Sequence, residues 1–122
     1  MVGQLLALLY VSFLGSGWVR IMSTYNPDNW VIVKIGDDYK VLAGWSGSYL
    51  YGDSWRLSSG IVRIEDHSDV FRIYNHSGSC YVCRKSGYKL RRNNSYVWRE
   101  IQKTFGDDCS ILDEHTDWGN LV

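Results

Sequence analysis

From Trp30 onward the chain carries short apolar runs, some β-branched and some alternating with polar residues, a pattern typical of β-strands. The run WVIVKI at 30–35 is followed by GDD and then by YKVLAG at 39–44. Because Gly and Asp favour tight turns between β-branched runs, the sequence predicts a β-hairpin turning over Gly36, Asp37 and Asp38.

A second hairpin is predicted over residues 61–74. IVRIE places Val62 and Ile64 on one apolar face, and VFRIY repeats the alternation after a DHSD turn. The run SCYVCR at 79–84 follows an NHSG turn and adds a third strand, so this part of the chain is expected to form a meander.

The apolar period then changes to that of a helix, within SYVWREIQKTF. Asn93 or Asn94 is a suitable N-cap, and Gly106 stands where a helix would end. The positions expected on the buried face are Val97, Ile101 and Phe105. One helix is therefore predicted to close over the sheet.

These elements predict an α+β fold, with a small antiparallel β-meander sheet of about five strands and one C-terminal helix packed on it. A last short strand is expected around Cys109 to Leu112, before an acidic, poorly ordered end. Residues 22–122 are predicted to form a single α+β domain, and residues 1–21 an apolar N-terminal extension.

The extension is apolar from Leu5 to Leu14, about half of a membrane span, with no Lys or Arg ahead of it. Three interpretations stay open. In the first, which is preferred, translation starts at Met22 and residues 1–21 result from a misplaced start codon. In the second, the segment is a signal or anchor. In the third, it is a structural helix.

Residues 44–60, GWSGSYLYGDSWRLSSG, combine turn-forming glycines with large aromatic rings. Most of these rings are expected to cover the core, because a small sheet has an open face, although they could instead face outward. Arg56 could stack on Trp55 and pair with Asp53, or present its guanidinium to a ligand. The candidate binding residues are Trp45, Tyr49, Tyr51, Trp55 and Arg56.

Residues 84–92, RKSGYKLRR, are basic without any acid. Mobile cationic groups contact phosphates, and an aromatic ring can stack on an unpaired base. The candidate nucleic-acid residues are Arg84, Lys85, Tyr88, Lys89, Arg91 and Arg92. The alternative is a solvated basic loop whose field is neutralised by the acidic tail, residues Asp107, Asp108, Asp113, Glu114 and Asp117.

The overall charge is balanced, with 13 basic and 13 acidic residues, so it argues neither for non-specific duplex binding nor for the acidic surface of a nucleic-acid mimic. Cys80, Cys83 and Cys109, with three histidines, could by residue type form a zinc site. However, Cys80 and Cys83 lie three apart in a predicted strand and would point to opposite faces. Buried free thiols are the better interpretation, so no metal and no cofactor is predicted.

No complete catalytic constellation is present, and an enzyme is not favoured.

Two segments, KVLAGWSGSYLYGDSWRLSSGI at 40–61 and SGYKLRRNNSYVW at 86–98, resemble small uncharacterised proteins of tailed bacteriophages. Those proteins have G-W-x-G-x-Y, G-D-S-W-R and N-S-G-I segments in that order, and here Ser58 and Ser59 replace the last Asn-Ser. The resemblance brings no activity and no binding residues. It implies a phage accessory protein in the bacterial host cytoplasm, provided that residues 1–21 are not a signal or anchor.

The function favoured by these observations is non-enzymatic binding of a macromolecular partner through the aromatic residues of 44–60. A protein is the favoured partner. The alternative is a nucleic-acid-binding module that uses residues 84–92. A third possibility is an enzyme or binder of a small ligand held under the 44–60 loop. No membrane partner is expected if Met22 is the true start.

Overall fold

The computed structural model describes residues 11–14, 17–20, 23–47 and 52–122. Within these ranges the strands are β1 (Val11–Leu14), β2 (Gly17–Arg20), β3 (Ser23–Tyr25), β4 (Asn29–Ile35), β5 (Asp38–Trp45), β6 (Ser54–Leu57), β7 (Ile61–Asp66), β8 (Val70–Asn75), β9 (Ser79–Arg84) and β10 (Cys109–Ile111). The helices are α2 (Arg92–Phe105) and the 3-10 turns η1 (Lys85–Gly87), η2 (Gly106–Asp108) and η3 (Trp118–Asn120).

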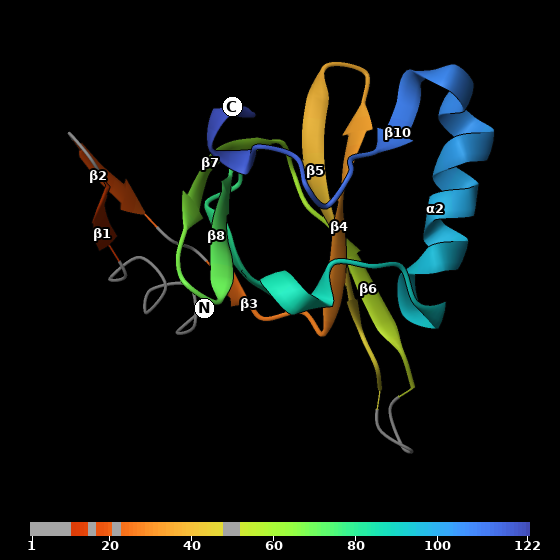
Figure 1. Ribbon diagram of the computed structural model, residues 1–122, viewed down its shortest axis with the longest axis horizontal. Coiled ribbons are helices and arrows are strands. Elements are labelled where there is room, and N and C mark those ends of the chain that lie inside the picture. The colour runs from red at the N-terminus through yellow and green to blue at the C-terminus, as the bar shows by residue number, and fades with distance from the viewer. Residues whose placement is uncertain (1–10, 15–16, 21–22, 48–51) are drawn as a thin grey trace, which may run out of the picture.

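Two four-stranded sheets form the body of the molecule (Figure 1). The first sheet has the order β10-β4-β5-β6, and the second has the order β3-β9-β8-β7. All pairs are antiparallel except β3 with β9. The α+β class and the helix packed on a sheet are confirmed. The sequence predicted one sheet, but the predicted strands divide between two. The 30–44 hairpin belongs to the first sheet and the 61–84 meander to the second, because the chain passes from one sheet to the other between β6 and β7.

The first sheet is buried on both faces. Trp30 and Ile32 of β4 point toward the second sheet and join the core between the sheets. Val31 and Val33 point the other way and pack against Val97 and Ile101 of α2. A strand covered on both faces needs an unbroken apolar run, which is what WVIV supplies. The layers are therefore helix, first sheet and second sheet.

The predicted hairpin at 30–44 is confirmed as β4 and β5, with Ile35 opposite Asp38. Gly36 has φ +60°, a conformation that glycine adopts without strain. The turn therefore needs only Gly36 and Asp37, and Asp38 already belongs to β5.

The second predicted hairpin forms as β7 and β8, and β9 extends it into the expected meander. The prediction that Val62 shares an apolar face with Ile64 is wrong. The register of β7 shifts between Ile61 and Arg63, as in a β-bulge, so Ile61 is buried and Val62 is 44% exposed.

The helix is confirmed, but Asn93 and Asn94 do not precede it. The helix begins at Arg92, and both asparagines are buried in its first turn. The side-chain oxygen of Asn94 accepts a hydrogen bond from the backbone N–H of Arg91 (2.9 Å), which satisfies a donor at the helix start. Gly106, at φ +56°, ends the helix as predicted.

A buried cluster of asparagines joins the start of α2 to the first sheet. Asn93 Nδ2 donates to Asn29 Oδ1 over 2.6 Å, and Asn29 Nδ2 lies 3.1 Å from the side-chain oxygens of both Asn93 and Asn94. Asn94 also donates to the carbonyl of Leu42 in β5. These amides satisfy one another away from water, so they fix the position of the helix on the sheet.

The expectation of a poorly ordered acidic end is wrong at Trp118. β10 pairs with β4, and the N–H of Leu112 donates to the carbonyl of Ile32, so the tail returns along the first sheet. Trp118 is 5% exposed and belongs to the core between the sheets. One large indole can bury enough apolar area to hold a polar tail in place.

At the N-terminus, β1 and β2 form an antiparallel hairpin in which Val11 pairs with Arg20. The helix interpretation does not hold for these two strands. Residues 1–10, 15–16 and 21–22 lie outside the described residues, so the misplaced start and the signal or anchor stay predictions. Of the helices in the described ranges, none combines the length and apolarity needed to cross a bilayer.

Candidate binding site between α2 and β6

The aromatic residues of 44–60 separate into two groups. Trp45 is half-buried, with its indole N–H donating to the carbonyl of Asn26 (3.0 Å) and its ring against Tyr25. Trp55 is 44% exposed and faces outward. Tyr49 and Tyr51 lie outside the described residues. Covering of the core is thus seen for Trp45, and outward presentation for Trp55.

Arg56 lies on the opposite side of β6 from Trp55. Its guanidinium stands over the ring of Tyr25, 4.6 Å from the ring centroid. Adjacent residues of a strand point to opposite faces, so the predicted stacking of Arg56 on Trp55 is wrong. The Asp53 carboxylate instead accepts a hydrogen bond from the N–H of Gly47.

The outward side of Trp55 borders a groove between β6 and α2. The groove encloses about 260 Å³. Its lining residues are Trp55 and Leu57 from β6 and Tyr96, Val97, Glu100, Ile101, Thr104 and Phe105 from α2. Among the described residues, three of the five exposed large hydrophobic side chains meet here, namely Trp55 (44%), Tyr96 (47%) and Phe105 (43%). Such a concentration of exposed apolar area marks an interaction surface.

β6 is also the edge of the first sheet. Antiparallel pairing alternates between residues that bond to the neighbouring strand and residues whose N–H and C=O point away from it. The N–H of Ser58 donates to the carbonyl of Val41 in β5 (2.9 Å). Ser58 therefore bonds to β5, and by the same alternation so does Arg56. The backbone groups of Trp55 and Leu57 therefore point to the open edge, beside the groove that their side chains line.

The groove has little charge. Of the described residues that line it, only Glu100 is charged, and its carboxylate pairs with the ammonium of Lys103 at 3.1 Å. An occupant of the groove would gain mainly from burying apolar surface, because exposed ion pairs contribute little.

Tyr96 was not among the predicted site residues, and Phe105 was predicted on the buried face of the helix. Phe105 continues the spacing of Val97 and Ile101, yet it projects beyond the sheet and stays 43% exposed. Tyr96 precedes Val97 on the helix. The signal in the sequence that could have identified Tyr96 is a large aromatic residue outside the predicted buried face of this helix. That both rings line the same groove as Trp55 depends on the packing of α2 on the sheet.

The basic segment also separates into two groups. Tyr88 is half-buried, and its hydroxyl accepts a hydrogen bond from the N–H of Ile32 and donates one to the carbonyl of Leu112. The ammonium of Lys85 pairs with Asp66 and lies over Phe71. Burial raises the pKa of Tyr88 to about 12. The Tyr88 hydroxyl therefore makes its hydrogen bonds within the fold, and its half-buried ring is not placed to stack on a base.

Four residues of the basic segment remain on the surface, Arg84, Lys89, Arg91 and Arg92. Arg84 donates to the carbonyl of Asp28 (3.3 Å). The ion pairs found in the described ranges join Arg63 and His67 to Glu65, Lys85 to Asp66, and Lys103 to Glu100. None of these pairs links the acidic tail to the basic segment, so direct pairing does not neutralise these four cations.

Cys80 and Cys83 lie in β9 and are fully buried on opposite faces, as the alternation predicted. Cys83 joins the core between the sheets. Burial raises the pKa of Cys83 well above its usual value and also raises that of Cys80. Both thiols are therefore held in their unreactive protonated form. No cluster of three or more His, Cys, Asp or Glu side chains suited to a metal ion occurs in the described part of the chain.

A small polar network surrounds Glu65 on β7. Its carboxylate accepts hydrogen bonds from the Tyr74 hydroxyl (3.2 Å) and Arg63 Nε (3.3 Å), and lies 3.2 Å from His67 Nε2. Burial by itself would raise the pKa of Glu65, but the hydrogen bonds with His67, Tyr74 and Arg63 outweigh it and lower the pKa. Burial raises the pKa of Tyr74 to about 12. A carboxylate stabilised in this way is a poor proton acceptor, which suits a structural role.

Comparison with known proteins finds no matching family model, no matching curated protein and no matching solved structure.

Proposed function

We propose that the protein acts without catalysis, by binding an extended segment of a partner protein along β6 and in the groove beside α2. The observation that supports this function is the coincidence of two features at Trp55 and Leu57. Their backbone groups point to the open edge of the sheet, and their side chains line the apolar groove.

The expected binding mode is addition of a strand. A peptide strand placed beside β6 would exchange hydrogen bonds with the backbone of Trp55 and Leu57. Every second side chain of that strand would face α2, because side chains alternate along a strand. An apolar side chain at such a position would enter the groove and contact Trp55, Tyr96 and Phe105. Because every second side chain faces α2, the peptide is expected to carry apolar residues at alternate positions.

The resemblance of residues 40–61 and 86–98 to small phage proteins supports an accessory role for this binding. The partner would then be a protein of the phage or of its bacterial host, met in the host cytoplasm. The aromatic segment 44–60 contributes one wall of the site through β6, and the other wall comes from α2.

The test is selection of peptides from a random display library on the immobilised full chain, followed by affinity measurement of the selected peptides. We expect sequences with apolar residues at every second position, and about tenfold or greater loss of affinity in Trp55→Ala and in Phe105→Ala. Val62→Ala is the matched control, because Val62 is equally exposed at 44% but lies on β7.

Hydrogen exchange gives a second readout of the same complex. The amides of Trp55 and Leu57 should become protected when a selected peptide binds, because they point to the open edge. The amide of Arg56 should change little, because it faces β5. Binding that is unaffected by Trp55→Ala, or that leaves the amides of Trp55 and Leu57 exchanging freely, would disprove strand addition.

A second candidate function is nucleic-acid binding through Arg84, Lys89, Arg91 and Arg92, supported by the exposure of these four cations. Fluorescence anisotropy of single- and double-stranded oligonucleotides over a salt series tests it. The affinity should fall steeply with salt and collapse in the Arg91→Ala/Arg92→Ala variant. Arg99→Ala/Lys103→Ala removes the same charge further along α2 and serves as control. Equal weakening by both variants would rule out this surface.

A further inference from the structure

Arg56 lies in the middle of β6, on the face that is turned toward the second sheet. Its partner in β5 is Ala43, which is buried in the core between the sheets. Trp55 and Leu57, its neighbours in the strand, line the groove beside α2 instead, because successive side chains of a strand alternate. An extended segment added beside β6 would therefore meet the groove on one face and Arg56 on the other.

The guanidinium of Arg56 is supported by an aromatic ring while its side chain stays exposed. It stands 4.6 Å from the ring centroid of Tyr25, a half-buried residue of β3. Tyr25 in turn packs against the buried Tyr81, with 5.0 Å between the two ring centroids. A guanidinium that rests on a fixed ring loses less conformational freedom when it binds a carboxylate.

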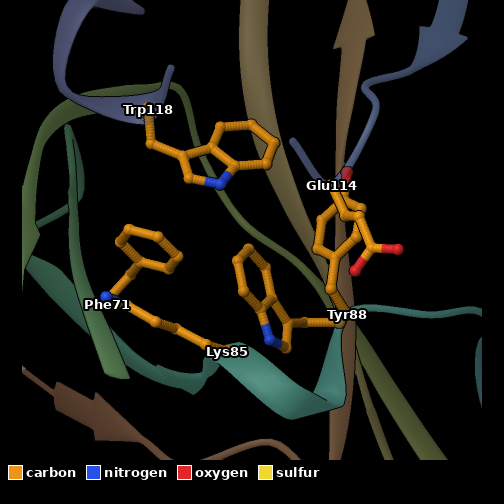
Figure 2. A pocket seen from close by; sticks show the side chains of 6 residues that line it. Phe71, Lys85, Tyr88, Glu114 and Trp118 are labelled. Atoms are coloured by element: carbon orange, nitrogen blue, oxygen red, sulfur yellow. The ribbon is translucent and has the colours of Figure 1, made fainter. Parts of the chain in front are cut away.

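No carboxylate among the described residues lies within ion-pair distance of Arg56. Lys85 shows the contrast. In the pocket that Figure 2 shows, its ammonium also stands over a ring, 4.8 Å from the centroid of Phe71, but Asp66 pairs with it. Arg56 is thus a ring-supported cation beside an open strand edge, and no ion pair in the described part of the chain neutralises it.

The backbone register of β6 decides what would lie opposite Arg56. Ser58 bonds to β5 and so, by alternation, does Arg56, whereas the backbone groups of Trp55 and Leu57 point to the open edge. In an antiparallel added strand, the residue opposite Arg56 would form a non-hydrogen-bonded pair with it, in which the Cα atoms are about 4.5 Å apart and the side chains lie close together. That residue stands between the two that face α2.

We infer that Arg56 selects a carboxylate in the bound segment, so that the partner protein presents an acidic residue between two apolar ones. This inference rests on the proposed strand addition at β6. An arginine holds a carboxylate through two parallel hydrogen bonds, and opposite charges directly across an antiparallel pair stabilise the pairing. The apolar residues supply most of the affinity, and the acid supplies the register and the choice of partner, because exposed ion pairs contribute little free energy.

A second copy of the chain fits this edge less well. Its own β6 carries Arg56 between Trp55 and Leu57, so two β6 strands paired about this residue would place two guanidinium groups opposite each other. Like charges directly opposite destabilise an antiparallel pair. The expected partner is therefore a different protein, which carries the acid that β6 lacks.

The test is selection on the immobilised full chain from a display library of peptides with two fixed leucines, one position apart, and random residues elsewhere. We expect Asp and Glu to be enriched about fivefold at the position between the leucines, relative to the other random positions. On the Arg56→Gln chain this enrichment should disappear while leucine-containing peptides are still captured. Tyr25→Leu should reduce it, because the guanidinium loses its support. Arg99→Gln, which removes an exposed charge from α2, is the matched control and should leave it unchanged.

Single peptides then give the affinities. A selected peptide with Glu between its leucines should bind about fivefold more tightly at low salt than the same peptide with Gln. This ratio should approach one in concentrated NaCl, because salt screens an exposed ion pair.

The outcomes separate this inference from strand addition itself. Captured peptides without enrichment of acid between the leucines, or with the same enrichment on the Arg56→Gln chain, would overturn the inference and leave strand addition standing. If the native chain captures no peptide from this library, strand addition fails and the inference fails with it.

Discussion

Gly44 in β5 lies directly against the side chain of Asn93 at the start of α2. A Cβ atom added to Gly44 would stand 2.0 Å from Oδ1 of Asn93, far inside van der Waals contact. The absence of a side chain at Gly44 is therefore what allows the asparagine cluster to form between the helix and the sheet. This contact positions α2, and with it the α2 wall of the binding groove.

The first prediction is that Gly44→Ala destabilises the protein by about 2–3 kcal/mol, because overpacking displaces Asn93 and disturbs its hydrogen bonds. Urea denaturation of the native chain and the variant measures this difference. Gly119→Ala is the matched control, since the nearest atom to its added Cβ is 3.7 Å away. Equal midpoints for Gly44→Ala and the native chain would show that the close approach is not present in solution.

Removing the hydroxyl of Tyr88 should cost about 1–3 kcal/mol, because Tyr88→Phe leaves the buried N–H of Ile32 and the carbonyl of Leu112 without their partner. Chemical denaturation followed by circular dichroism provides the measurement. Tyr96→Phe, on the exposed face of α2, should stay within about 0.5 kcal/mol of the native chain. A silent Tyr88→Phe would mean that water replaces the hydroxyl.

Stability should fall at alkaline pH. Burial raises the pKa of Tyr74 and Tyr88 from 10.0 to about 12, so the folded state holds two protons that the unfolded chain has already released. Their contribution is complete below pH 10 and is lost as the pH rises toward 12. Denaturation midpoints measured over this range should decline less steeply in Tyr88→Phe. Parallel declines would contradict the raised pKa of Tyr88.

Trp118→Ala should destabilise the fold by about 3–5 kcal/mol, because a buried indole is lost from the end of the core. Thermal unfolding of the variant tests this, with Trp118→Phe as the milder change that keeps a ring at the position. Unchanged thermal stability after Trp118→Ala would show that the tail does not close the core in solution.

The cysteines should differ in reactivity toward a disulfide reagent. Burial raises the pKa of Cys80 and Cys83, and both side chains are inaccessible, whereas Cys109 is partly exposed. One thiol should react rapidly in the native protein, and the other two only on unfolding. The rapid phase should disappear in Cys109→Ser. More than one fast thiol in the native chain would contradict the burial of β9.

Local periodicity was sufficient for the parts of the fold that depend on neighbours in sequence. The β4–β5 hairpin followed from its apolar run and from Gly36, and the buried face of α2 followed from the spacing of Val97 and Ile101. The β7–β9 meander followed from its turn residues. In each case the residues that decide the structure lie within one turn or one helical period of each other.

The candidate sites were only partly predictable. Trp55 was identified from its aromatic surroundings, but its partners Tyr96 and Phe105 were not, because nothing near residue 55 in sequence indicates that α2 will pack beside it. Tyr88 was interpreted as a stacking ring, and its hydrogen bonds to Ile32 and Leu112 involve residues far away along the chain.

The sequence by itself determined the α+β class, most of the strands and the helix, because hydrophobic alternation and turn chemistry act over a few residues. Only the tertiary structure decided that β3 to β10 divide between two four-stranded sheets, that β6 lies at an edge beside α2, and that Trp118 closes the core between the sheets. These features depend on which distant surfaces bury each other, a choice made by the packing of the whole chain rather than by any short segment of it.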